Sequence, residues 1–72
     1  MQREQIVSRD RDVMNGALVF AGTRVPVEVL VQHLTAGDSL DVFLDDFPSV
    51  SREQAVAFLQ MALKEAEDAR AA

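Results

Sequence analysis

The fold is decided by residues 26–63, PVEVLVQHLTAGDSLDVFLDDFPSVSREQAVAFLQMAL, where apolar residues recur at helical spacing between two breaks. In the first segment they fall at i, i+3, i+4 and i+7, which makes one apolar face of a helix. These positions are Val27, Leu30, Val31 and Leu34. Pro26 suits a first helical position because it has no N–H to leave unpaired, and Gly37 can take the left-handed conformation that ends a helix. We therefore expect a helix over residues 26–37.

Two more helices are predicted after this one. Residues 39–47 repeat the same spacing behind an Asp38 or Ser39 cap, and Pro48 stops the segment. Residues 51–70 open with a capping box, in which Ser51 and Gln54 satisfy each other's N–H groups. The inner face of this last helix is expected to carry Ala55, Phe58, Leu59, Ala62, Leu63 and Ala66. A short helix, a tight turn and a longer helix have the layout of a helix-turn-helix.

Residues 1–25 are predicted to form a short β-hairpin and a turn. The strand candidates are residues 5–8 and 17–20, and the Asn15-Gly16 pair between them favours a tight turn. We cannot say from the sequence whether the hairpin closes within one chain or across a dimer. The expected fold is mainly α: an N-terminal β-hairpin followed by a three-helix bundle with a helix-turn-helix-like layout, in one domain of 72 residues.

The composition narrows the possible chemistry. Cysteine is absent and there is one histidine, which excludes disulfides, thiolate zinc sites and imidazole-rich metal sites, so we expect neither metal nor cofactor. With 49% apolar residues but four aromatic ones, we expect a core of Leu, Val and Ala. Domains this small have little core to stabilise them, so a homodimer is expected. No apolar run is long enough to span a membrane and no secretory signal opens the chain, so we expect a cytoplasmic protein.

Charge is distributed unevenly along the chain. Residues 1–26 carry four arginines against three acids, whereas residues 27–72 carry three basic residues against nine acids, within a total of −5. Strong DNA affinity needs several basic side chains against phosphates. The acidic helical part therefore favours a protein partner over nucleic acid alone.

Three motifs, in their order along the chain, resemble the motifs of a bacterial family called domain of unknown function 433. The first motif spans residues 16–27 and contains Gly22-Thr23-Arg24-Val25-Pro26-Val27. The second spans residues 34–39 and contains Gly37-Asp38-Ser39, and the third spans residues 46–54 and contains Phe47-Pro48-Ser49-Val50. The resemblance covers about residues 6–66. Leu18, Phe47 and Val50 depart from the proline, tyrosine and leucine usual in the family. The resemblance implies a small helix-turn-helix protein, and some members are regarded as antitoxins paired with a nuclease toxin of the PIN class.

Four residues are candidates for contact with such a partner: Arg24, Thr23, His33 and Arg70. The Arg24 guanidinium could grip carboxylates of a nuclease metal site, or it could pair internally with Asp45 or Asp46. Thr23 is expected to bond nearby backbone. His33 lies away from the main apolar face, either on a partner surface or at an unremarkable flank.

Six residues could instead face DNA: Ser49, Ser51, Arg52, Gln54, Gln60 and Lys64. Arginine and glutamine can read base edges. We find no nucleophile–base pair, phosphate loop or metal cluster, so we expect no catalytic residue and no enzyme. The sequence favours a partner-binding antitoxin that could also bind its operator, and the alternative is a stand-alone helix-turn-helix transcriptional regulator.

Overall fold

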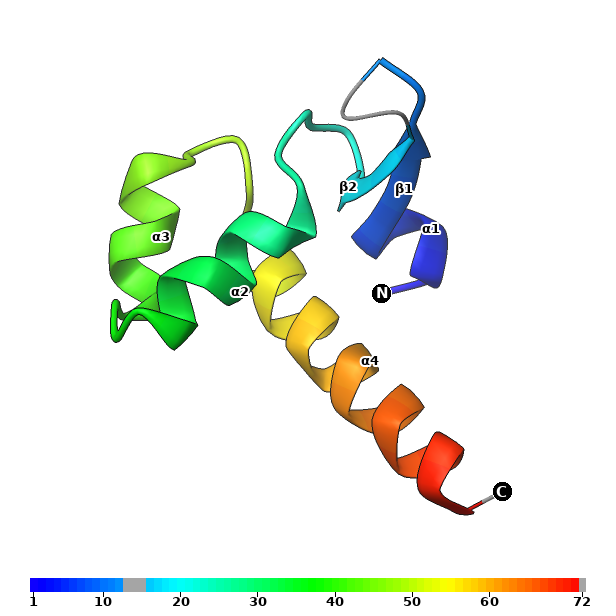
Figure 1. Ribbon diagram of the computed structural model, residues 1–72. Coiled ribbons are helices and arrows are strands. Elements are labelled where there is room, and N and C mark those ends of the chain that lie inside the picture. Colours follow the sequence, from blue (N-terminus) through cyan, green and yellow to red (C-terminus); the bar gives the residue numbers. More distant parts are fainter. Residues whose placement is uncertain (13–15, 72) are drawn as a thin grey trace.

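The structure, a computed structural model, describes residues 1–12 and 16–71, with an N-terminal hairpin and a larger helical part (Figure 1). The elements in chain order are α1 (Arg3–Ile6), β1 (Val7–Asp10), β2 (Ala17–Phe20), α2 (Val27–Thr35), α3 (Leu40–Asp46) and α4 (Arg52–Ala71). The predicted mainly helical fold behind an antiparallel hairpin is confirmed. No helix in the described ranges is both long and apolar enough to cross a membrane.

The hairpin closes within one chain. β1 and β2 are antiparallel, with Val7 opposite Phe20 and Asp10 opposite Ala17. Asn15 lies outside the described residues. The chain then turns back, so that Pro26 forms a bridge with Val19 on the other edge of β2. This turn carries the chain from the sheet directly into α2.

The N-terminal strand prediction is wrong in its first two residues. Gln5 and Ile6 belong to α1, an additional helix that the sequence analysis did not predict. One turn is closed by the Gln5 side chain, whose Oε1 accepts from the Gln2 N–H at 2.8 Å, while the Gln5 N–H donates to the Gln2 carbonyl at 2.9 Å. These local bonds compete with strand pairing, so β1 begins at Val7.

The helix boundaries follow local capping chemistry. Pro26 is in an extended conformation one residue before α2, not its first helical residue as predicted. Gly37 has φ +92°, the left-handed conformation expected just beyond a helix. Ser39 caps α3 by accepting from the Val42 N–H at 3.2 Å, and Ser51 caps α4 by accepting from the Gln54 N–H at 3.0 Å.

The buried core is mostly aliphatic, as expected, but three phenylalanines occupy its centre. The largest fully buried side chains are Phe20, Phe43, Leu30 and Val19. The Phe20 ring lies 5.7 Å from that of Phe58 in an edge-on arrangement and 6.0 Å from that of Phe43. The rings join β2, α3 and α4 at one point, because one large side chain from each element fills more space than several small ones.

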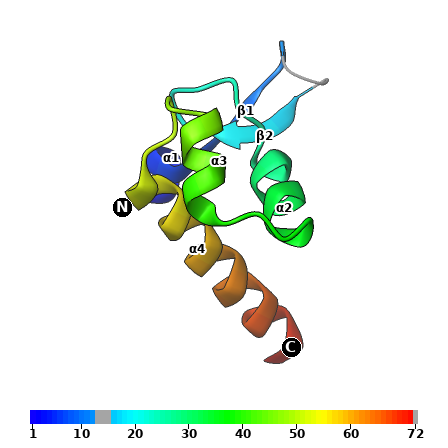
Figure 2. The same cartoon turned by 90° about the vertical axis from the view of Figure 1, so that its left-hand side faces the viewer.

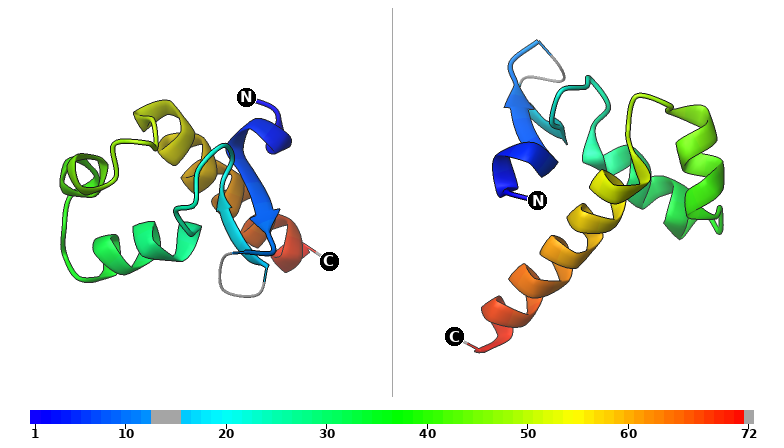
Figure 3. Two further views of the ribbon diagram at one scale, coloured as in Figure 1. Left: turned by 90° about the horizontal axis from the view of Figure 1, so that it is seen from above. Right: turned by 180° about the vertical axis from the view of Figure 1, so that it is seen from behind.

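The second half of α4 runs away from the rest of the molecule (Figures 1 and 3). Residues 62–69 are all exposed, and Leu63 keeps 61% of its surface accessible. The prediction that Ala62, Leu63 and Ala66 line the inner face of the helix is therefore wrong. Figure 2 shows α2, α3 and the hairpin gathered around the other end of α4, so its last turns have no element of this chain to pack against.

Candidate functional site

The turn between β2 and α2 holds Arg24 in a well-bonded backbone. Gly22 takes φ +77°, a conformation that other residues rarely adopt. The Thr23 hydroxyl donates to the Phe20 carbonyl at 2.8 Å and accepts from the Val25 N–H at 3.0 Å. The expectation that Thr23 bonds nearby backbone is confirmed, and these bonds engage the hydroxyl within the chain.

Arg24 itself is exposed at the tip of this turn. Within residues 1–12 and 16–71 its guanidinium makes no hydrogen bond and no ion pair. The interpretation that it pairs with Asp45 or Asp46 is wrong, since Asp46 instead approaches His33. Among the residues that the structure describes, all five N–H donors of the guanidinium are therefore available, on a turn held by backbone hydrogen bonds.

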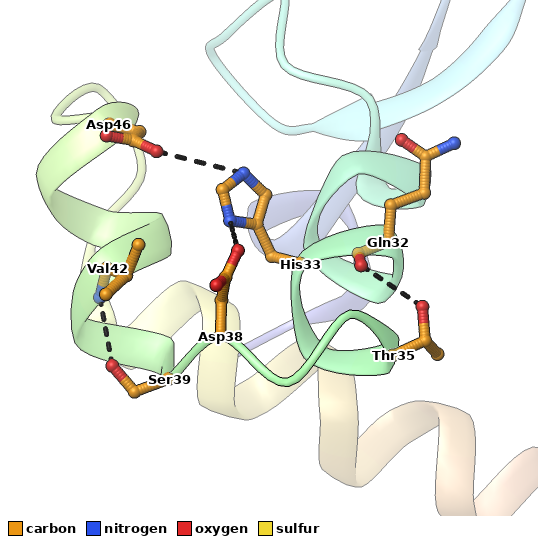
Figure 4. Close-up of polar contacts among 7 residues, drawn as sticks. All are labelled: Gln32, His33, Thr35, Asp38, Ser39, Val42 and Asp46. Atoms are coloured by element: carbon orange, nitrogen blue, oxygen red, sulfur yellow. Dashed lines mark hydrogen bonds and ion pairs between the residues drawn. The ribbon is translucent and has the colours of Figure 1, made fainter.

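His33 lies between α2 and α3, and Figure 4 shows one carboxylate near each nitrogen of its ring, from Asp38 and Asp46. The Nδ1 atom is 3.1 Å from Oδ2 of Asp38, and the Nε2 atom is 3.9 Å from Oδ2 of Asp46. The Nδ1 atom is buried, and its contact with Asp38 lacks the alignment of a hydrogen bond despite the short distance. The ring also stands edge-on to Phe43 and Phe47, at centroid distances of 5.6 and 5.9 Å.

This arrangement makes His33 part of the packing between α2 and α3. Its side chain is 19% exposed, and contact with a partner stays a prediction for this residue. The two carboxylates approach opposite nitrogens, so one metal ion could not bind all three groups. Across the part of the chain that is described, no cluster of three His, Asp or Glu residues suits a metal.

Gln54 is a structural residue rather than a DNA contact, which corrects its predicted role. It is 6% exposed, and its Nε2 donates to the carbonyls of Gln5 and Ile6 at 3.2 Å and of Ala21 at 2.9 Å. One amide thus ties α4 to both ends of the hairpin. In the expected capping box the Ser51 half is present, whereas the Gln54 amide points to the hairpin. The position of Gln54 in the helix could have indicated this role. Because an α-helix turns about 100° per residue, Gln54 lies beside Phe58 on the inner face.

The other residues predicted to face DNA do not gather on one basic surface. Ser49 is exposed in the loop before α4, and Ser51 caps that helix. Arg52 pairs with Asp41 of α3, whose exposed side also carries Asp45 and Asp46. The electrostatic surface near the start of α4 is therefore dominated by carboxylates, which repel phosphate.

Gln60 and Lys64 lie farther along α4, beside α1. They line an open cavity of about 430 Å³ together with Met1, Arg3, Ile6, Ala57 and Met61. Arg3 crosses this groove, and its Nη1 lies 2.5 Å from Oε1 of Glu65. Gln60 and Lys64 therefore lie beside this groove, about two to three helical turns along α4 from Arg52. Arg70 stands in the last turn of α4, and its side chain is not among those described.

The hairpin, the bonded Gly22–Pro26 turn and the helices that follow define a small protein with an exposed arginine where sheet meets helix. The chain belongs to the protein family of unknown function DUF433, whose family model matches residues 7–62. The matched range begins at β1 and ends one residue before Leu63, so the far turns of α4 lie beyond it. Comparisons with curated proteins and with solved structures gave no match.

Proposed function

We propose that this protein is a non-enzymatic partner-binding module, the antitoxin of a type II toxin–antitoxin pair that neutralises a PIN-type nuclease. The observation that carries the proposal is Arg24, an exposed residue on a hydrogen-bonded turn whose guanidinium has no partner among the described residues. Arginine binds carboxylates in a bidentate manner. A nuclease that holds its metal with acidic side chains presents such carboxylates, and an inserted guanidinium would compete with the metal for them.

The acidic surface supports a protein partner over DNA. The net charge is −5, Arg52 is already paired with Asp41, and Gln54 is buried. The alternative function, a stand-alone regulator, requires α2, α3 and α4 to act as a three-helix bundle with a helix-turn-helix layout. It would have to read DNA with Ser49, Arg52, Gln60 and Lys64, which are spread along more than two turns of helix.

The test is co-expression with the protein encoded by the neighbouring reading frame, scoring both growth rescue and co-purification. The Arg24→Ala variant should keep its helical circular dichroism and melting temperature but lose rescue and complex formation. Arg11→Ala is the matched control, because Arg11 is also an exposed hairpin arginine. If neither toxicity nor a complex is found, the proposal fails, and binding of the purified protein to its own promoter becomes the next measurement.

The same preparation tests the remaining expectations. A homodimer in the cytoplasm is part of the proposal, since a domain this small has limited core to stabilise it alone. Light scattering on the free protein should give twice the 7.9 kDa mass of one chain. A monomeric mass would leave the partner as the only source of added stability.

A further inference from the structure

An apolar stripe runs along α4 on the side away from the hairpin. We call Val56, Leu59, Leu63 and Ala66 the α4 stripe; their spacing of three, four and three residues places them on one face of the helix. Val56 is 36% exposed and Leu63 is 61% exposed, while Leu59 is half-buried against the core. The stripe therefore begins at the core and continues onto the exposed part of the helix. This part of α4 extends away from the other elements in Figures 1 and 3.

The flanks of the α4 stripe differ in character. Helical spacing places Glu53, Gln60, Glu67 and one base, Lys64, along one side and the small residues Ala62 and Ala69 along the other. Within residues 62–69, Lys64 is outnumbered by Glu65, Glu67 and Asp68. Small residues on one flank allow a neighbouring backbone to approach closely, and acidic residues on the other favour a basic neighbour.

A second copy of the chain does not complement this surface. An antiparallel pair that stacks Leu59 on the Leu63 of a second copy would place Glu53 next to the Glu67 of that copy, twice. A parallel pair would set Gln60 and Glu67 against alanines, without any opposite charge. Because like charges at an interface are unfavourable and the second arrangement gains no ion pair, self-association through this face is disfavoured.

We infer that the α4 stripe is a second docking surface for the protein partner, which receives it in an apolar groove with lysines or arginines on the rim. This inference rests on the proposed function. In Figure 1 the end of α4 and the turn that carries Arg24 lie far apart, so one partner would hold the molecule at two separate places. Leu63 is the anchor, because it is the most exposed large apolar side chain of the stripe.

The experiment measures affinity for the neighbour-encoded protein with wild-type chain, Leu63→Glu, Glu67→Lys and the control Val42→Glu. Val42 is 43% exposed on α3, so the control places the same charge on a comparable surface away from the α4 stripe. Glutamate is nearly as good a helix former as leucine, so the Leu63 variant should fold normally, as circular dichroism would verify. We expect about tenfold or greater weakening for Leu63→Glu, weakening for Glu67→Lys, and little change for Val42→Glu.

Three other outcomes are possible, and each contradicts either the docking surface, its occupant or the proposed function. If the wild-type complex forms and Leu63→Glu binds equally well, the docking surface is wrong while the proposed function stands. If Leu63→Glu instead converts a free dimer into a monomer, the α4 stripe joins copies of this chain and the inference fails. If the wild-type protein forms no complex, both the proposed function and this inference fail.

Discussion

The two halves of α4 belong to one continuous helix but have opposite surroundings. From Arg52 to Met61 the helix buries Gln54, Ala55 and Phe58 under the hairpin and the aromatic core. From residue 62 to 69 apolar residues still recur at helical spacing, at Ala62, Leu63 and Ala66, among four charged residues, yet every position is exposed. The difference teaches that amphipathic spacing specifies which side of a helix can be buried, whereas burial also requires another element within reach.

The same contrast exists on α2, where it predicts the largest effect. Leu30 is completely buried, and its neighbour Val31 is 44% exposed. Leu30→Asp should unfold the protein, because an unpaired carboxylate in the core costs several kcal/mol and a domain this small has about that much net stability. Val31→Asp should stay folded. Circular dichroism at room temperature would distinguish them, and a folded Leu30→Asp variant would refute the assigned core.

A second pair of variants compares the two halves of α4 directly. Phe58→Ala removes a ring that packs on Phe20 and should cost about 3–5 kcal/mol. Leu63→Ala removes an exposed side chain and should change stability by less than about 0.5 kcal/mol. Urea unfolding of both proteins would measure the difference. Equal destabilisation would mean that the far half of the helix is covered in solution.

The buried amide of Gln54 should have an intermediate effect. Gln54→Ala leaves the carbonyls of Gln5, Ile6 and Ala21 without this donor, and each unsatisfied buried group is expensive. We expect a loss of about 1–3 kcal/mol in the free energy of unfolding. Gln60→Ala, on the exposed side of the same helix, is the control and should be nearly neutral. Identical unfolding curves would contradict the role of Gln54 in holding the hairpin.

The smallest effect is expected where α1 meets the middle of α4. Arg3 and Glu65 form an ion pair, but their side chains are 59% and 58% exposed. Such pairs contribute less than about 1 kcal/mol and are screened by salt. Arg3→Ala should therefore lower the urea midpoint slightly in dilute buffer and not at about 1 M salt. A large loss that persists in salt would show that Arg3 acts by packing over Met61.

Parts of the fold that depend on neighbouring residues could be predicted from the sequence. The helical segments, the caps at Ser39 and Ser51, and the backbone bonds of Thr23 all follow from side chains within a few positions. The helix α1 was missed although its capping bond is also local, because Gln5 precedes a β-branched stretch that favours a strand.

The candidate site was predicted less well, because its residues depend on distant contacts. Arg24 could be identified from the sequence, but the absence of an ion pair between it and Asp45 or Asp46 depends on how the turn and α3 are placed in space. His33 was assigned to the surface because spacing along α2 does not show that α3 folds over it. Gln54 was assigned to DNA because a glutamine near a helix start is usually exposed, and here the hairpin covers it.

The sequence by itself determined where helices and turns form, because apolar period, capping hydroxyls and glycine at Gly37 act within one turn of chain. Only the tertiary structure decided which apolar faces are covered. Phenylalanines from β2, α3 and α4 meet because the hairpin folds back onto the helices, and that meeting place is at the beginning of α4. Leu63 is exposed for the same reason, since a 20-residue helix extends beyond the reach of the elements that bury its first half.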